Sequence, residues 1–192
     1  CKKASRVQGF LDALVILRHS IHQNSVHNAQ SKYSYQMVAI IHESGGCDAH
    51  VDLLEKLGYI PLVKSNPVNV SEITTNDWYR DNVKFENCCG DDEFVKLYAY
   101  TLIQYPIVVH WDLDVAVLQP MDDLFDAMLL DKDSESGKAA RERLHVQYPR
   151  AQHQLPDRID AFFTRDVTSA KPWEKVRAVQ GGFVVARPSL EH

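Results

Sequence analysis

The chain has no apolar run that approaches the roughly 20 residues needed to cross a bilayer, so we expect no membrane segment in it. Its start, CKKASRVQGF, lacks the apolar core of a secretory signal. Basic residues are not in excess: 21 Lys and Arg stand against 26 Asp and Glu, for a formal charge of −5. This balance argues against nucleic-acid binding, which usually needs a basic face. The cytoplasm and the Golgi lumen both stay open as compartments.

Cysteine is also scarce. The 192 residues include four cysteines, at Cys1, Cys47, Cys88 and Cys89. The adjacent pair Cys88–Cys89 has the wrong spacing for a zinc knuckle, and no paired histidines complete one. Disulfides in an oxidising compartment and free thiols are equally compatible with this count. The chain has no internal repeat and no strongly nucleophilic side chain in a recognisable setting.

Helical patterns alternate with short, fully apolar runs along the chain. Helices are expected at residues 10–23, 48–57, 91–102 and 121–129, and strands at 35–42, 59–63, 107–111, 159–163 and 181–186. Residues 64–77 are turn-rich and read as a long loop, and residues 131–154 as a charged surface excursion or mobile loop. Helices that alternate with apolar strands predict a doubly wound α/β domain, whose parallel sheet is covered on both faces.

The stretch YPIVVHWDLDVAVLQPMDDLF places two carboxylates, Asp112 and Asp114, at the end of an apolar strand. In extended backbone, side chains two apart point the same way, so both acids would converge while Leu113 faces the core. Converging carboxylates repel unless a cation lies between them, and hard oxygen ligands suit Mn²⁺ or Mg²⁺. A bare Asp-x-Asp more often caps a turn, but the preceding buried strand favours a metal site here.

Two chemistries use such a strand end. In haloacid-dehalogenase-like phosphohydrolases the first Asp attacks phosphorus, but there Gly and Thr usually follow, whereas this chain continues with Val115, Ala116 and Val117. We keep that reading as an alternative. In nucleotide-sugar transfer, a metal bridges the acids and the donor diphosphate and offsets the charge that builds on the leaving group. This second chemistry needs no strongly nucleophilic side chain.

The segment EFVKLYAYTLIQYPIVVHWDLDVAVLQPMDDLFDAM resembles the central signature of glycosyltransferase family 8, the glycogenin-like and galactinol-synthase-like enzymes. The signature has a lysine on a helix (Lys96), an apolar strand, Asp-x-Asp, and an Asp-x-Leu-Phe helix that begins near Asp123. VQGGFVVARPSLE (179–191) and ALVILRHSIH (13–22) resemble two further family segments. The resemblance extends from about Phe10 to Glu191, and its central part is the most specific.

The resemblance implies a GT-A fold, a UDP-sugar donor, Mn²⁺ (or Mg²⁺), transfer with retention, and a glycan, protein or polyol acceptor. By this resemblance, Asp112 and Asp114 would bind the metal. The resemblance assigns no catalytic residue. The donor would be bound by a set of six positions: Lys96, Asp112, Leu113, Gln180, Gly181 and Gly182. The family often has Asn-Ser-Gly where this chain has Gln180–Gly181, which leaves the sugar open.

The same resemblance makes residues 1–192 one partial transferase domain. Its first strand would lie at or before Cys1, and its later motifs, including a histidine of the metal site, would lie beyond His192. A non-catalytic relative that binds sugar nucleotides is the second alternative.

Several other residues have a structural interpretation. We expect His110 to be a hydrogen-bonded core histidine and Trp111 to serve packing. Arg165 and Asp166 follow a strand and are expected to form a salt bridge, although the arginine could hold phosphate. Arg80, in the stretch TNDWYRDN, could contact donor or acceptor or simply fold its loop.

Overall fold

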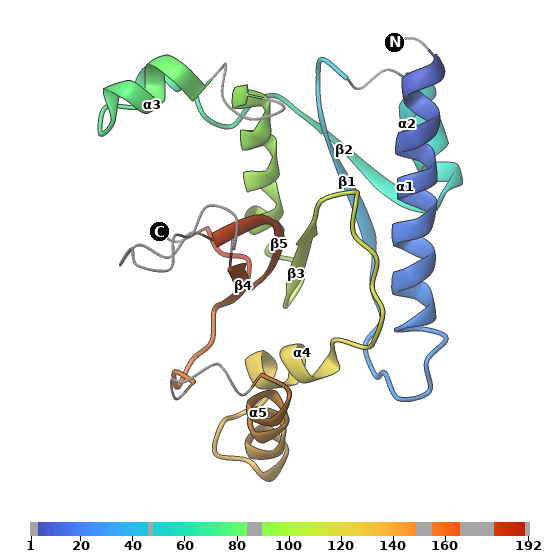
Figure 1. The fold of residues 1–192 in the computed structure, drawn as a ribbon, viewed down its shortest axis with the longest axis vertical. Helices are drawn as coiled ribbons and strands as arrows, with labels where there is room; N and C mark the ends of the chain where they lie inside the picture. The colour runs from blue at the N-terminus through green and yellow to red at the C-terminus, as the bar shows by residue number, and fades with distance from the viewer. Residues whose placement is uncertain (1–3, 46–47, 84–89, 149–154, 166–178, 191–192) are drawn as a thin grey trace.

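A computed structural model describes residues 4–45, 48–83, 90–148, 155–165 and 179–190 of the chain (Figure 1). All four cysteines and Asp166 lie outside these ranges. The predictions of disulfides or thiols, and of an Arg165–Asp166 salt bridge, therefore concern residues that the structure does not describe. None of the helices in the described ranges is both long enough and apolar enough to span a membrane.

Helices and strands mix along the chain, as the sequence predicts. In order, the described elements are α1 (Ala4–Gln23), β1 (Met37–His42), α2 (Asp48–Lys56), β2 (Tyr59–Lys64), the 3₁₀ turn η1 (Val70–Glu72), α3 (Asp77–Asn82), the 3₁₀ helix η3 (Gly90–Thr101), β3 (Val108–Trp111), α4 (Asp122–Leu129), α5 (Glu135–Gln147), β4 (Ala161–Arg165) and β5 (Val179–Ala186). The fold is therefore of the mixed α/β class.

The described strands form two sheets, not the single, mostly parallel sheet that we expected. β1 pairs with β2 in parallel, with Met37 opposite Tyr59. β5 lies between β3 and β4 and is antiparallel to both, with Val185 opposite Val109 on one side and Phe162 on the other. An apolar run predicts a strand but does not show whether the neighbouring strand is parallel or antiparallel. The parallel direction that we expected for β3, β4 and β5 was therefore wrong.

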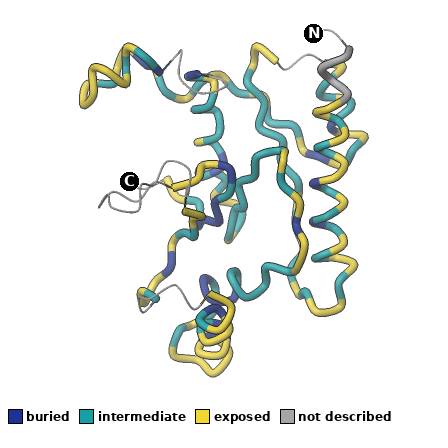
Figure 2. Tube along the Cα trace, viewed as in Figure 1, coloured by how far each residue is buried: buried dark blue, intermediate teal, exposed yellow. Residues whose placement is uncertain are grey.

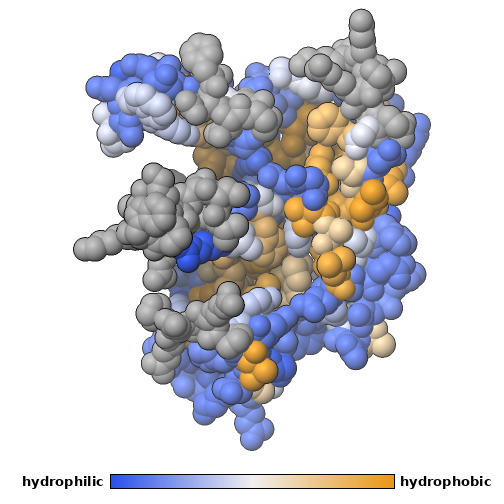
Figure 3. Space-filling model, viewed as in Figure 1, coloured by the Kyte–Doolittle hydropathy of each residue, from blue (hydrophilic) through white to orange (hydrophobic). Residues whose placement is uncertain are grey.

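A groove separates the two sheets. It has a volume of about 1200 Å³ and is lined mainly by apolar side chains of α1, β1, η3 and β3. The residues of β1 and β3 are only half-buried (Figure 2), although the sequence predicts fully buried strands. Hydrophobic atoms are exposed along the side of the molecule that α1 and β1 occupy (Figure 3). Where β1 and β3 begin, the Tyr105 hydroxyl donates a hydrogen bond to the Gln36 side chain across the groove.

Two hydrophobic clusters hold the described part of the chain together. The larger surrounds Val185 on β5, which is fully buried, and includes Met128, Leu144 and Ile159. The smaller joins Leu17 and Ile21 of α1 to Val117, and Trp111 and Leu113 pack against it. Of the stripe expected on α1, Leu17 and Ile21 are buried, whereas Phe10 is exposed.

Residues expected to be loop contain helices. Residues 131–154 include α5, and Ser134 caps the N-terminus of this helix. The Ser134 hydroxyl accepts a hydrogen bond of 3.0 Å from the Gly137 N–H. The buried residue Leu144 places α5 in the larger cluster, and Ala140 on the same helix is buried as well. Residues 64–77 likewise contain η1 and the start of α3. The helix expected at 91–102 is present but is a 3₁₀ helix, η3.

Candidate functional site

Asp112 is the first residue after β3, and its backbone is fixed by the neighbouring strand. Its N–H donates a hydrogen bond of 2.8 Å to the carbonyl of Gly182 on β5. The preceding residue, Trp111, stands opposite Phe183, and their ring centroids are 4.8 Å apart. The aromatic packing and the hydrogen bond together set where the Asp112 carboxylate leaves the sheet.

Lys96 of η3 binds this carboxylate directly. The Lys96 Nζ lies 2.8 Å from Asp112 Oδ1 and 2.6 Å from Glu93 Oε2. Side chains three apart eclipse each other in a 3₁₀ helix, which brings Glu93 and Lys96 together. Burial lowers the pKa of Lys96, but hydrogen bonds to Asp112 and Glu93 outweigh burial, so that its pKa lies above the ordinary value. The ammonium is therefore a permanent positive charge at Asp112.

Gly182 allows the other carboxylate oxygen to pack closely against β5. A Cβ at position 182 would lie 2.7 Å from Asp112 Oδ2, whereas a Cβ at Gly181 would meet nothing within 4 Å. The expected donor-binding glycines thus differ: Gly182 borders Asp112, and Gly181 faces open space. Gln180 is exposed on β5, opposite Thr164 of β4.

Asp114 does not lie in the extended backbone from which we expected it to converge with Asp112. β3 ends at Trp111, and Leu113 and Asp114 form a turn. Leu113 packs against the smaller hydrophobic cluster, as expected. Asp114 is exposed and makes no hydrogen bond or ion pair with another residue in the described ranges. Lys96, Asp112 and Leu113 line the groove, while Asp114 is absent from its described lining.

The donor chemistry here suits a hard divalent cation, since both acids offer oxygen ligands. Within the described ranges, however, no three His, Cys, Asp or Glu side chains are grouped so that they could hold a metal. Asp112, with Asp114 after a change in its turn, could supply part of a coordination shell.

A second contact between η3 and β3 joins Tyr100 to His110. His110 is two residues before Asp112 on β3, and its Nδ1 lies 3.3 Å from the Tyr100 hydroxyl. Burial, followed by the charge of Lys96, lowers the pKa of His110. His110 is therefore hydrogen-bonded, as expected, but it is half-buried and lines the groove instead of lying in the core.

The two arginines considered from the sequence lie elsewhere. Arg80 binds its own helix, with Nη1 2.7 Å from Asp77 Oδ1 and Nε 2.9 Å from Asp81 Oδ1. Its carboxylate partners identify Arg80 as a residue that folds its loop. Arg165 is exposed at the end of β4.

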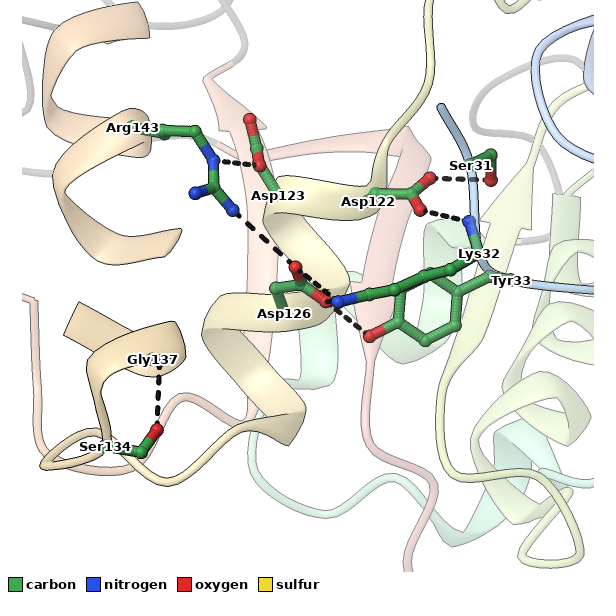
Figure 4. Close-up of polar contacts among 9 residues, drawn as sticks. All are labelled: Ser31, Lys32, Tyr33, Asp122, Asp123, Asp126, Ser134, Gly137 and Arg143. Atoms are coloured by element: carbon green, nitrogen blue, oxygen red, sulfur yellow. Dashed lines mark hydrogen bonds and ion pairs between the residues drawn. The ribbon is translucent and has the colours of Figure 1, made fainter. Parts of the chain in front are cut away.

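A second carboxylate cluster, on α4, was not predicted (Figure 4). Asp126 is 5% exposed, accepts a hydrogen bond of 2.6 Å from the Tyr33 hydroxyl and lies 2.8 Å from Lys32 Nζ. Asp123 pairs with Arg143 of α5 at 2.6 Å. Asp122 accepts hydrogen bonds from the Ser31 hydroxyl and the Lys32 N–H, both of 2.8 Å. These acids fasten the segment before β1 and the helix α5 to α4.

Glu93 is the other residue that the sequence reasoning missed. The sequence did contain a sign of this ion pair, because an acid that lies three residues before a lysine on a predicted helix can pair with that lysine. The carboxylates of α4 offered no comparable signal, since their partners Tyr33, Lys32 and Arg143 are distant in the sequence or on a helix that was read as a loop.

Comparison of the whole chain with models of protein families, with curated proteins and with solved structures found no match. The site must be interpreted from its own chemistry.

Proposed function

We propose that this chain is a nucleotide-sugar transferase domain, of the GT-A type implied by its resemblance to glycosyltransferase family 8. It would transfer a hexose from a UDP-sugar to a glycan, protein or polyol acceptor with retention. The observation that carries the proposal is the position of Asp112: a carboxylate at the end of an apolar strand, packed against Gly182 and paired with Lys96.

Each residue of the site has a role in this proposal. Asp112 and Asp114 would hold Mn²⁺ or Mg²⁺, and the bound cation would offset the charge that develops on the leaving UDP. Lys96 would bind the diphosphate or the sugar through its three N–H donors. Gln180 and Gly181 would border the donor sugar. Gly182, which has no side chain, would let the Asp112 carboxylate keep its place close to β5.

Donor binding provides the first test. We expect UDP to bind in the presence of Mn²⁺, to bind much more weakly without it, and to lose this metal dependence in Asp112→Asn. Isothermal titration calorimetry measures all three, and Asp52→Asn, an exposed substitution on α2, is the matched control. Equal Mn²⁺-dependent UDP binding by Asp112→Asn and the parent would refute the metal assignment.

Turnover separates the alternatives. We expect UDP release from UDP-glucose, UDP-galactose or a related donor when Mn²⁺ is present. Binding of UDP without release from any donor would favour the non-catalytic relative. Release of phosphate from small phosphate esters, lost in Asp112→Asn, would instead favour the phosphohydrolase.

A further inference from the structure

A small pocket, separate from the candidate site, lies between α1 and the amino ends of β1 and β2. It has a volume of about 220 Å³, and its lining includes Arg18 and His22 of α1, Tyr35 and Gln36 before β1, and Gly58 before β2. In the described part of the chain, no aspartate or glutamate lines this pocket. A water molecule takes about 30 Å³ of liquid volume, so the pocket has room for a small polyatomic ion.

Arg18 brings a permanent positive charge to the pocket, and no described residue binds it. Its Nε is buried without a hydrogen-bond partner, and its guanidinium makes no ion pair with a described carboxylate. The side chain lies against the backbone of Gly58, where a Cβ would come within 2.8 Å of Arg18 Nη2. A buried donor without an acceptor costs stability, and an anion in the pocket would supply the acceptor that the protein lacks.

Histidines next to Arg18 can add further positive charge. His22 is four residues after Arg18, so the two side chains lie on the same face of α1. The His22 Nδ1 lies 2.9 Å from the Tyr35 hydroxyl, and its ring centroid is 4.4 Å from that of His27. Burial, and then the charges of His27, Arg18 and His19, lower the pKa of His22. An anion beside His22 would act in the opposite direction and favour its protonated form.

We propose that this pocket is an anion site, in which the Arg18 guanidinium binds a tetrahedral oxyanion of the phosphate type. The planar fork of an arginine presents two N–H donors to such an ion, and no acid in the described lining repels it. The small volume suits a free inorganic ion. The pocket lies where β1 and β2 begin, whereas Asp112 follows the last residue of β3, so this inference is independent of the proposed donor site.

The geometry predicts which changes alter binding of sulfate, a tetrahedral oxyanion that serves as the probe. Arg18→Gln removes both the charge and the fork, and it should weaken sulfate binding by about tenfold or more. Arg18→Lys keeps the charge without the fork, and it should give an intermediate affinity. Because bound sulfate should raise the pKa of His22, binding should tighten as the pH falls from 8 to 5.5. This pH dependence should be smaller in His22→Gln.

The experiment is a titration of the purified chain with sodium sulfate, in which sodium chloride keeps the ionic strength constant. Two-dimensional ¹H–¹⁵N NMR follows the backbone amides beside the pocket and the Nε–H of Arg18. Arg158→Gln is the matched control, because Arg158 already has an acceptor in Asp160 at 2.7 Å. Lys96→Met shows whether the anion binds at the candidate site instead. Circular dichroism melting confirms that each variant folds, and a repeat with inorganic phosphate checks that the site accepts this ion too.

Saturable binding that Arg18→Gln weakens, and that Arg158→Gln and Lys96→Met leave unchanged, would support the inference. The absence of saturable binding in the parent, or an equal affinity in Arg18→Gln, would refute it. Loss of binding in Lys96→Met but not in Arg18→Gln would place the anion at the candidate site and would also refute it. Should Arg18→Gln fail to fold, Arg18→Lys decides: an affinity equal to that of the parent would show that the fork of Arg18 does not bind the anion.

Discussion

Two adjacent glycines on β5 offer a test of the candidate site at the scale of single residues. A Cβ at position 182 would come within 2.7 Å of Asp112 Oδ2, while a Cβ at 181 would meet nothing within 4 Å. The clash is with the end of a side chain, so Asp112 can move and the fold can persist. We therefore expect Gly182→Ala to displace the carboxylate and to weaken Mn²⁺-dependent UDP binding by about tenfold or more.

Gly181→Ala is the matched control, because it makes the same chemical change one residue away on the same strand. Calorimetric titration with UDP and Mn²⁺ compares the two variants, and thermal melting checks that both fold. Equal affinities in the two variants would mean that binding does not depend on the position of the Asp112 carboxylate.

Tyr59 gives a prediction for pH. Its side chain is 5% exposed, and its hydroxyl donates a hydrogen bond of 2.7 Å to the carbonyl of Leu14. Burial raises its pKa from 10.0 to about 12, against a smaller opposite effect of Arg18. Between these two values the unfolded chain has lost this proton and the folded chain keeps it. Stability from this group is thus complete below pH 10 and declines as the pH rises toward 12.

The decline from this one residue amounts to about 2 kcal/mol across that window. Urea denaturation at pH 9 and pH 11.5 measures it in the parent and in Tyr59→Phe. We expect the loss of unfolding free energy between the two pH values to be smaller in Tyr59→Phe. Tyr79→Phe, at an exposed position, is the control. An identical loss in Tyr59→Phe and the parent would contradict the assignment.

The site shows how far residues can be predicted from sequence. That Asp112 ends a strand and that Leu113 packs inward followed from the apolar run before them. The distance from Lys96 to Asp112 and the steric role of Gly182 depend on how η3 and β5 lie against β3, which no local pattern specifies. The extended backbone that we expected through Asp114 is absent, because the strand ends one residue before Asp112 and a turn follows.

At the scale of elements, α5 is the clearest difference between prediction and structure. Its segment is charged and contains few large apolar residues, so a loop was expected. Two features support the helix instead: a Ser134 N-cap at its start, and the burial of Leu144 in the larger cluster. A short helix stabilised mainly by packing has a weak sequence signal, because the apolar surface it buries belongs largely to its neighbour α4.

Replacing Leu144 tests whether α5 is part of the core. Leu144 is 5% exposed, whereas Val146 on the same helix is 73% exposed. We expect Leu144→Ala to lower the unfolding free energy by about 2–5 kcal/mol, since it leaves a cavity in the larger cluster. Val146→Ala should change it by less than about 0.5 kcal/mol. Urea denaturation followed by circular dichroism gives both values, and a negligible effect of Leu144→Ala would return this segment to the surface loop first expected.

The strands were predicted better as elements than as a sheet. Each of the five apolar runs that predicted a strand contains a strand in the structure, and its ends differ from the prediction by a few residues. The predicted parallel pairing was wrong for β3, β4 and β5, because parallel and antiparallel neighbours produce the same buried faces when helices cover both sides. β5 is antiparallel to β3 and β4, and only β1 and β2 have the expected parallel arrangement.

At the scale of the whole molecule, the described strands divide between two sheets, and the groove lies between them. α1 contributes to the smaller cluster beside β1, while β5 lies at the centre of the larger one with α4 and α5. The links between the two sides include polar ones: Asp126 with Lys32 and Tyr33, and Tyr105 with Gln36. Since buried apolar area dominates stability, we expect the side with the larger cluster to open less often.

Hydrogen exchange measured by mass spectrometry tests this division. In the parent, amides of β5 should exchange more slowly than those of β1, because Val185 is fully buried whereas the residues of β1 are half-buried. Leu17→Ala removes a core side chain of the smaller cluster, and we expect faster exchange in α1, β1 and β2 with little change in β5. Val185→Ala, at a cost of about 2 kcal/mol, should speed exchange in β3, β4 and β5.

We expect the two variants to affect different amides, and this difference tests whether the two sheets open separately. If Leu17→Ala and Val185→Ala each accelerated exchange equally in every strand, the chain would unfold as one cooperative unit in spite of its two sheets. The groove would then be only a gap in one packed core. If the effects remain separate, the groove divides two units of different stability. Lys96 and Asp112, which line it, would then lie at the boundary between those units, where a bound donor could stabilise one against the other.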